Sequence, residues 1–243
     1  MKTVAFLGSK DIGLECLRYL HAVQDELNFK IVYVLTNSKG GEIARFCEEN
    51  SIIIVDSLSN LLLRPDFDLG ISVQYHEILK KVHIAKASEL FVNLHMAPLP
   101  EYRGCNQFSF AILNQDKIFG TTVHRLEEGI DSGDIIIERR FEIPSDCWVN
   151  ELHSLAFKES LILFKEAVPI ILQGKYEFTS QSSLLDSRKT AMHYRKEIEE
   201  IKRIDLAWDK EKIARYIRAT LMPGFEPPHA IIDGRKIYLT EEL

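Results

Sequence analysis

The stretch TVAFLGSKDIGLECLRYLHAVQDELNFKIVYVL, residues 3–35, decides the fold. Thr3 to Leu7 is an apolar run typical of a buried strand, and Gly8-Ser9-Lys10 predicts the turn that ends it. From Asp11 to Val23 the apolar side chains recur at helical spacing, and Phe29 to Leu35 predicts a second strand. A strand, a helix and another strand in this order are typical of a parallel sheet.

The same alternation continues through the first half of the chain. Glu42 to Glu49 has a helical pattern, and further strands are predicted over residues 52–55, 67–75 and 90–95. We therefore predict an α/β fold with a doubly wound, mostly parallel sheet of the Rossmann-like kind. In such sheets ligands bind beyond the carboxyl ends of the strands, so the residues at those ends are the candidates for a site.

The pattern changes after residue 104. We expect a helix over Cys105 to Leu113, and then two β-rich segments, Thr121 to Leu126 and Asp134 to Ile143, joined by a glycine-containing turn. Val149 to Leu172 has the periodicity of a long amphipathic helix.

A small appendage is expected at the carboxyl-terminal end. Ile213 to Leu221 predicts a short helix, and Ala230 to Leu239 predicts a hairpin around Asp233-Gly234, which is a strong turn pair. We place a domain boundary near Leu184. The prediction is a main domain over residues 1–184 and a small helix and hairpin subdomain over residues 185–243.

Composition limits the class of protein. The 243 residues are 46% apolar, enough for a substantial core, and the net charge of −6 is spread without blocks of one sign, which argues against a general nucleic-acid surface. No apolar run approaches the ~20 residues of a membrane helix, and the apolar run after Met1 is too short for a signal peptide. Four separated cysteines without a C-x-x-C pair favour reduced thiols in a cytoplasmic protein over a zinc site or disulfides.

Three polar residues stand where strands are predicted to end or to turn. Asn93 and His95 are separated by one residue, so on a strand they project to the same side, and Asp131 lies in the turn of the following β unit. An amide can donate to a developing oxyanion, an imidazole can take a proton near neutral pH, and a carboxylate can orient that imidazole. Together these residue types suit acyl transfer to an amine.

Each of these residues also has a structural explanation. A histidine at a strand end is commonly a hydrogen-bonded structural group, and an aspartate between glycines is a common turn former. No neighbouring side chain suggests a covalent nucleophile, because Cys105, the nearest thiol, has no evident base. On these three residues alone, both interpretations stay open.

Two longer motifs carry a resemblance to a known family. NLHMAPLPEYRG at residues 93–104, followed by GTTVHRLEEGIDSGDI at residues 120–135, resembles the folate-dependent formyltransferases in composition, order and separation. That family includes glycinamide ribonucleotide, methionyl-tRNA and sugar N-formyltransferases, and the match runs from Met1 to about Gly174. The resemblance implies that Asn93, His95 and Asp131 take the catalytic positions. It also implies N10-formyltetrahydrofolate as the carrier, with no metal.

The resemblance further implies where the folate lies. Its pterin is expected in a slot with one wall at Leu126, Glu127, Glu128 and Gly129 and the other at His76, Ile78 and Leu79. One departure concerns the residues after His95, where many members have Pro-Ser and this chain has Met96-Ala97. The missing hydroxyl suggests a different acceptor contact and leaves the three catalytic positions untouched.

The expected acceptor is a nucleotide-linked amino sugar. Residues 185–243 are similar to the tails of short sugar N-formyltransferases and too few for the barrel domain of the tRNA-formylating members. The resemblance implies dTDP-4-amino-4,6-dideoxyglucose, used for the O-antigen of lipopolysaccharide. The nucleotide base and the C-3 or C-4 position of the amine stay open. The residues expected to contact the acceptor are Ser9, Lys10, Gln74, Tyr75, Tyr102, Arg103, Trp208, Arg218, Met222 and Phe225.

Several alternatives accompany these expectations. Trp208 and Phe225 can equally pack the appendage, and the turn from Gly8 to Gly13 lacks the full Gly-x-Gly-x-x-Gly spacing, so dinucleotide binding is excluded. The competing functions are hydrolysis of formyl-folate, formyl transfer to another small amine, and a non-catalytic folate- or sugar-binding module. The apolar tail strands are expected either to pair in a homodimer, as relatives suggest, or to cover their own domain.

Overall fold

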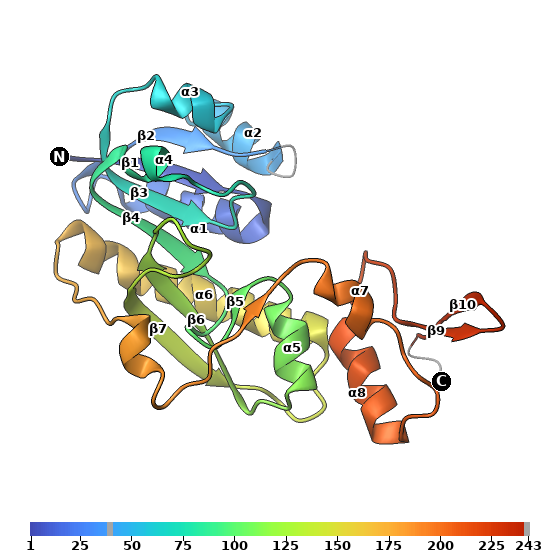
Figure 1. The fold of residues 1–243 in the computed structure, drawn as a ribbon. Coiled ribbons are helices and arrows are strands. Elements are labelled where there is room, and N and C mark those ends of the chain that lie inside the picture. Colours follow the sequence, from blue (N-terminus) through green and yellow to red (C-terminus); the bar gives the residue numbers. More distant parts are fainter. Residues whose placement is uncertain (38–40, 241–243) are drawn as a thin grey trace.

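A six-stranded sheet in the order β2-β1-β3-β4-β6-β7 forms the centre of the computed structural model, which describes residues 1–37 and 41–240 (Figure 1). Strands β1 to β4 pair in parallel, and β6 and β7 extend the sheet in antiparallel pairing. The predicted mostly parallel α/β sheet is therefore confirmed. Its strands are β1 (Lys2–Gly8), β2 (Phe29–Leu35), β3 (Phe67–Val73), β4 (Ala87–His95), β6 (Ile118–Arg125) and β7 (Ile135–Glu142).

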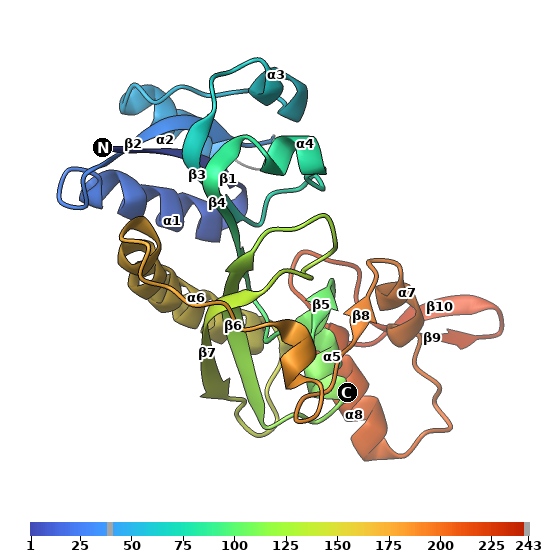
Figure 2. The same ribbon diagram turned by 60° about the vertical axis from the view of Figure 1, so that its left-hand side comes forward.

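Helices cover both faces of this sheet (Figure 2). On one face α1 (Lys10–Val23), α2 (Gly41–Glu49) and α6 (Val149–Leu172) enclose the larger apolar core, to which the sheet contributes side chains such as Val92. On the other face α3 (Leu58–Leu62) and α4 (Lys81–Ile84) cover a smaller cluster that contains Phe91. Because successive strand residues point to opposite faces, Asn93 and His95 share the face of Phe91.

Two strand predictions need correction. Residues 52–55 do not form a strand of the sheet but a single bridge, in which the amides of Val34 and Val55 donate to the carbonyls of Ile53 and Val34, both at 2.9 Å. Pairing stops there because Ser57 already caps α3, its hydroxyl accepting from the Asn60 amide. Strand β3 ends at Val73 instead of residue 75, because Gln74 adopts a left-handed φ of 52°.

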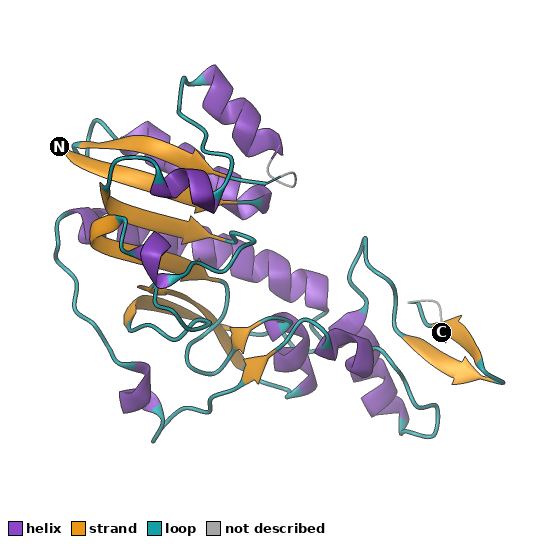
Figure 3. Cartoon of the chain, turned by 45° about the horizontal axis from the view of Figure 1, so that its top comes forward, coloured by secondary structure: helices purple, strands orange, loops and turns teal. Residues whose placement is uncertain are grey.

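The carboxyl-terminal part packs beside α5 (Gln107–Leu113). Its helix α8 (Lys210–Thr220) begins three residues before the predicted start, because the Asp209 carboxylate caps it by accepting from the Lys212 amide. The predicted hairpin is present as β9 (His229–Ile232) and β10 (Arg235–Tyr238), and it projects from the body (Figure 3). A small cluster around Ile217 and Leu239 joins α8 to the hairpin.

The segment that follows α6 stays in contact with the main body. The 3-10 helix η2 (Gln181–Leu184) lies next to β7, because Thr179 pairs with Ile135, and β8 (Met192–His193) pairs in parallel with β5 (Arg103–Gly104). A short helix, α7 (Glu197–Ile201), follows. The domain boundary near Leu184 stays a prediction. Over the residues described, no helix combines the length and apolar character needed to cross a membrane.

Candidate active site

Three side chains meet where β4 and β6 run side by side. Asn93 and His124 stand opposite each other in the antiparallel register, and the Asn93 Nδ2 and His124 Nε2 atoms are 3.2 Å apart. His95 follows two residues after Asn93 on the same face of the sheet and is 5% exposed. The hydroxyls of Thr121 and Thr122 donate to the carbonyls of His95 and Ala97, which fixes the backbone where β4 ends.

Asp131 reaches this point from the loop between β6 and β7. Its Oδ1 lies 3.6 Å from both His95 Nδ1 and His124 Nε2, and its Oδ2 accepts from the Gly104 amide at 2.9 Å. Burial alone would raise the pKa of Asp131, but the charge of His95, the contact with His124 and the Gly104 amide hold it well below its ordinary value. The carboxylate therefore stays ionised at neutral pH.

The hydrogen bonds of the two histidines define the tautomers of their neutral rings. His95 Nε2 donates to the Tyr102 carbonyl at 2.7 Å, which leaves the Nδ1 lone pair facing Asp131. His124 Nδ1 donates to the Arg125 carbonyl at 2.8 Å, so its Nε2 accepts from the Asn93 amide. His95 Nδ1 can thus take a proton that the Asp131 carboxylate would stabilise, and Asn93 keeps a second amide hydrogen for a ligand.

The sequence thus predicted three members of this cluster and missed one. We call Asn93, His95 and Asp131 the triad, and the structure brings them together with His124. The alternation of side chains along a strand could have identified His124. Residues 122 and 124 of β6 lie on one face, and they pair with His95 and Asn93. The structure defines this geometry, and the catalytic roles stay predictions.

The two walls predicted for the pterin come together through the smaller apolar cluster. Leu79 belongs to that cluster, and Leu126 packs against it, its amide donating to the Phe91 carbonyl at 2.7 Å. The Ile78 side chain is 75% exposed. His76 is exposed, with its ring 4.7 Å from that of Tyr75.

The remaining part of the second wall is polar. Glu127 pairs with Arg125 at 2.6 Å, and Glu128 and Gly129 are exposed. Within residues 1–37 and 41–240, the backbone groups of 127–129 make no hydrogen bond to the protein. A flat heterocycle with several donors and acceptors fits such an edge, because backbone amides and carbonyls next to an apolar surface can bind its rim.

Four of the predicted acceptor residues, Ser9, Lys10, Gln74 and Tyr75, follow the neighbouring ends of β1 and β3. The Ser9 hydroxyl donates to the Gln74 carbonyl, and Lys10 Nζ donates to the Gln74 side-chain oxygen at 2.9 Å. The Tyr75 hydroxyl donates to Glu77 at 3.1 Å. This group lies at the carboxyl edge of the sheet, where an open α/β fold presents ligands.

Two other predicted acceptor residues lie on the segment after β4. Tyr102 is 4% exposed, and its hydroxyl donates to Asp116 and accepts from Asn114 at 2.9 Å. Burial, together with the Asp116 bond, raises the pKa of Tyr102, so the hydroxyl stays protonated. The Tyr102 hydroxyl is thus bonded to side chains of the protein, and the Tyr102 carbonyl accepts from His95 Nε2. Arg103 is partly buried on β5.

The last four predicted acceptor residues belong to the appendage. Trp208 packs against Tyr216, with ring centroids 4.7 Å apart, and Lys212 Nζ lies 4.0 Å from its centroid. Arg218 contacts Asp146 at 3.4 Å. Met222 packs at the edge of the larger core, whereas Phe225 is 68% exposed. The structure therefore places Trp208 in a packing role and leaves the Phe225 ring at the surface.

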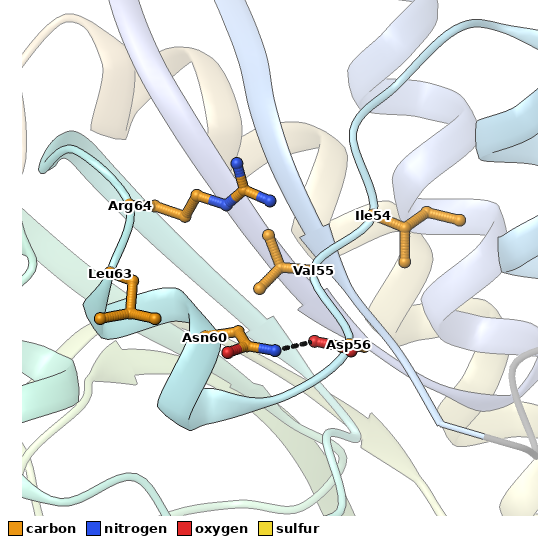
Figure 4. Close-up of a pocket in the computed structure, with 6 residues that line it drawn as sticks. All are labelled: Ile54, Val55, Asp56, Asn60, Leu63 and Arg64. Carbon is orange, nitrogen blue, oxygen red and sulfur yellow. Dashed lines mark hydrogen bonds between the residues drawn. The ribbon is translucent and has the colours of Figure 1, made fainter.

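A surface pocket on another part of the sheet lies between the 54–56 segment and α3 (Figure 4). It encloses about 480 Å³, and inside it the Asn60 amide donates to Asp56 at 2.6 Å. None of its lining residues belongs to the triad or to the predicted folate and acceptor contacts. Those residues are Ile54, Val55, Asp56, Asn60, Leu63 and Arg64.

Comparison with known proteins connects this geometry to one family. The sequence pattern of the family described as formyl transferase matches residues 2–168. GDP-perosamine N-formyltransferase of Brucella melitensis is 28% identical over 174 residues, which cover 72% of this chain and 64% of that relative. The chain thus spans less than two thirds of the length of that curated relative.

Two solved structures share the fold over nearly the whole chain. WlaRD, a sugar 3N-formyl transferase in the presence of dTDP and 5-N-formyl-THF, is 25% identical with a TM-score of 0.80, covering 98% of this chain and 85% of that one. A 4-N formyltransferase from Francisella tularensis has a TM-score of 0.80 at 21% identity, covering 100% and 98%. The second likeness concerns the fold alone.

Proposed function

The chain belongs to the formyl transferase family, and from this premise we propose that it transfers a formyl group from N10-formyltetrahydrofolate to the amine of a nucleotide-linked sugar. The observation that carries the proposal is the convergence of Asn93, His95 and Asp131, with His95 Nδ1 3.6 Å from Asp131 Oδ1. An amide donor, a proton acceptor and a carboxylate are the groups that such a transfer needs.

The reaction is balanced by one proton transfer. A bond forms between the sugar nitrogen and the formyl carbon, the bond from that carbon to N10 breaks, and the proton lost by the amine is delivered to N10. The folate supplies a one-carbon unit that is already activated for this transfer.

We assign each step to a group of the chain. Asn93 uses its second amide hydrogen to stabilise the oxygen that becomes negative. His95 Nδ1 takes the proton of the amine, directly or through water, and the nearby Asp131 carboxylate stabilises the resulting imidazolium. The same proton can then pass to the departing nitrogen, so that Asp131 remains ionised throughout.

For the acceptor, we propose dTDP-4-amino-4,6-dideoxyglucose, destined for the O-antigen of lipopolysaccharide. The position of Ser9, Lys10 and Gln74 at one end of the sheet supports an acceptor there, since Lys10 carries the positive charge that a diphosphate requires. The relatives differ in base and amine position, being a GDP-perosamine enzyme and a sugar 3N-formyl transferase observed with dTDP. The free state of all four cysteines supports a reaction in the cytoplasm.

The test is an incubation of the whole chain with N10-formyltetrahydrofolate and a set of acceptors, read by mass spectrometry. The set contains dTDP-4-amino-4,6-dideoxyglucose, its 3-amino counterpart and GDP-perosamine. We expect one added formyl group on the dTDP 4-amino sugar. Release of folate without a formylated sugar would indicate hydrolysis, and binding of both ligands without turnover would indicate a non-catalytic module; either result contradicts the proposal.

A further inference from the structure

The backbone of the loop that carries Asp131 needs contacts from other parts of the protein to keep its conformation. Asp131 has a left-handed φ of 47°, a conformation that is costly for a residue with a side chain. Two residues later, a Cβ on Gly133 would lie 1.9 Å from the Arg125 carbonyl oxygen, so the loop passes very close to β6. A loop with this geometry persists only where other parts of the protein hold it.

Gln181 supplies such a contact from η2. Its Nε2 donates both hydrogens, one to the Asp131 carbonyl and one to the Gly133 carbonyl, each at 2.8 Å. Gln181 is 8% exposed, and a lost donor would leave the buried bond to Gly133 and the partly buried bond to Asp131 unmade. One side-chain amide thus binds the carbonyls of both residues that flank Ser132.

The segment before Gln181 is itself fixed to the sheet. Thr179 and Ile135 exchange backbone hydrogen bonds at 2.8 and 2.9 Å, and the Phe178 ring lies 4.8 Å from the Arg125 guanidinium. Gln181 therefore approaches the loop from a rigid base. It lies beyond residues 2–168, over which the family pattern matches, and 50 residues after Asp131 in the chain.

The Asp131 carboxylate depends on that backbone for its place. Its Oδ2 is held by the Gly104 amide at 2.9 Å, and its Oδ1 lies 3.6 Å from both imidazoles. We propose that Gln181 is a positioning residue for formyl transfer, which fixes the 131–133 backbone so that the Asp131 carboxylate faces His95 and His124. This inference rests on the proposed function of the site.

The test compares three variants with the wild-type chain. Gln181→Met keeps the size of the side chain and removes both donors, and Gln181→Asn keeps an amide on a shorter side chain. Gln173→Met is the matched control, because Gln173 is exposed at the end of α6. We expect Gln181→Met to lower kcat about 10- to 100-fold, since misplacement of a catalytic group by about 1 Å costs that much.

The accompanying readouts separate positioning from loss of structure. KM for formyl-folate should stay within about 2-fold in Gln181→Met, since Gln181 does not line the predicted pterin slot. In an Asp131→Asn background the same substitution should change kcat less than about 3-fold, because its effect passes through the Asp131 carboxylate. An equal loss in both backgrounds would show a general structural role and overturn the inference.

Hydrogen exchange provides a readout that needs no substrate. The amides of Gly104 and Arg125, which donate to the Asp131 carboxylate and to the Asp134 carbonyl, should exchange faster in Gln181→Met than in the wild type or in Gln173→Met. If Gln181→Met does not fold, Gln181→Asn is expected to show the same changes to a smaller extent. Unchanged exchange and unchanged kcat in a folded Gln181 variant overturn the inference, whereas an inactive wild type with altered exchange overturns the proposed function only.

Discussion

At the scale of single residues, the orientation of each imidazole decides what the site can do. His95 directs its Nε2 hydrogen to the Tyr102 carbonyl and keeps Nδ1 next to Asp131, while His124 directs its Nδ1 hydrogen to the Arg125 carbonyl. Two histidines with their centroids 6.4 Å apart therefore have different roles. The first can accept a proton, and the second orients Asn93.

Replacement of either strand residue should nearly abolish turnover. Asn93→Ala removes the donor to the developing oxyanion, and His95→Ala removes the proton acceptor, so each should lower kcat about 100-fold or more. Steady-state kinetics with the acceptor that is turned over gives the measurement, and circular dichroism checks that the fold is retained. Wild-type rates in both folded variants would contradict the assignment.

His124 should have a smaller and different effect. His124→Ala removes the acceptor that fixes the Asn93 amide and one of the two imidazoles beside Asp131. We expect kcat to fall about 10-fold, less than the roughly 100-fold cost of losing a catalytic group itself, with little change in KM. His124→Asn keeps a polar group and should recover part of the loss. A fall in affinity for folate without a fall in kcat would instead place His124 in the folate slot.

At the scale of elements, a charged cluster joins β7 to the segment after η2. Glu138 on β7 accepts from Arg188 at 2.6 and 2.9 Å and from Arg140 at 2.9 Å, and Arg188 also donates to the Leu99 carbonyl at 3.0 Å. Burial raises the pKa of Glu138, but the bond from Arg188 and the charge of Arg140 outweigh it and lower the pKa below its ordinary value. The cluster thus links the loop after β4 to a segment far along the chain.

This cluster predicts a pH-dependent stability. The pKa of Glu138 is lower in the folded protein than in the unfolded chain. The stabilisation by the Glu138 carboxylate is therefore complete above its unfolded pKa of about 4.3, and it is lost as the pH falls through its folded pKa. Glu138→Gln should therefore be less stable than the wild type by roughly 1–3 kcal/mol at pH 7, and the difference should shrink near pH 3. Urea unfolding at both pH values measures it. A difference that stays constant between them would contradict the assignment.

At the scale of the whole molecule, the projecting hairpin leaves apolar side chains in solvent. Ile231, Ile232, Ile237 and Tyr238 are 42–49% exposed, whereas Leu239 is buried in the appendage. The hairpin therefore does not cover its own domain with these residues, which favours the other expectation, pairing in a homodimer. A two-fold interface brings the same surface of two copies together.

The prediction is that this surface holds two copies together. Ile232 and Ile237 lie on one face of the hairpin, since Ile237 pairs with Ala230 and Ile232 follows two residues later. Ile232→Asp with Ile237→Asp should convert a dimer into a monomer, because it buries charge in an apolar contact. Light scattering after gel filtration gives the mass, and Lys189→Asp, at an exposed residue outside the hairpin, is the control. A dimeric double variant would contradict the prediction.

The sequence by itself determined the elements and most of the sheet. The apolar periods of strand and helix are local, so β2, α6 and the hairpin around Asp233-Gly234 lie where the residues predict them. The motifs at 93–104 and 120–135 also indicated the triad residues, because each motif is a continuous stretch that can be recognised in the sequence. The 52–55 segment was misassigned, since its apolar residues do not reveal that the cap of α3 follows at once.

Only the tertiary structure decided which distant groups meet. His124 joins Asn93 through the antiparallel register of β4 and β6, and Gln181 reaches Asp131 across 50 residues. Neither contact can be read from a sequence pattern. A hydrogen bond between distant segments depends on how the elements pack and not on the sequence neighbours of either residue. A local pattern specifies a strand or a helix, whereas packing specifies which side chains converge at its end.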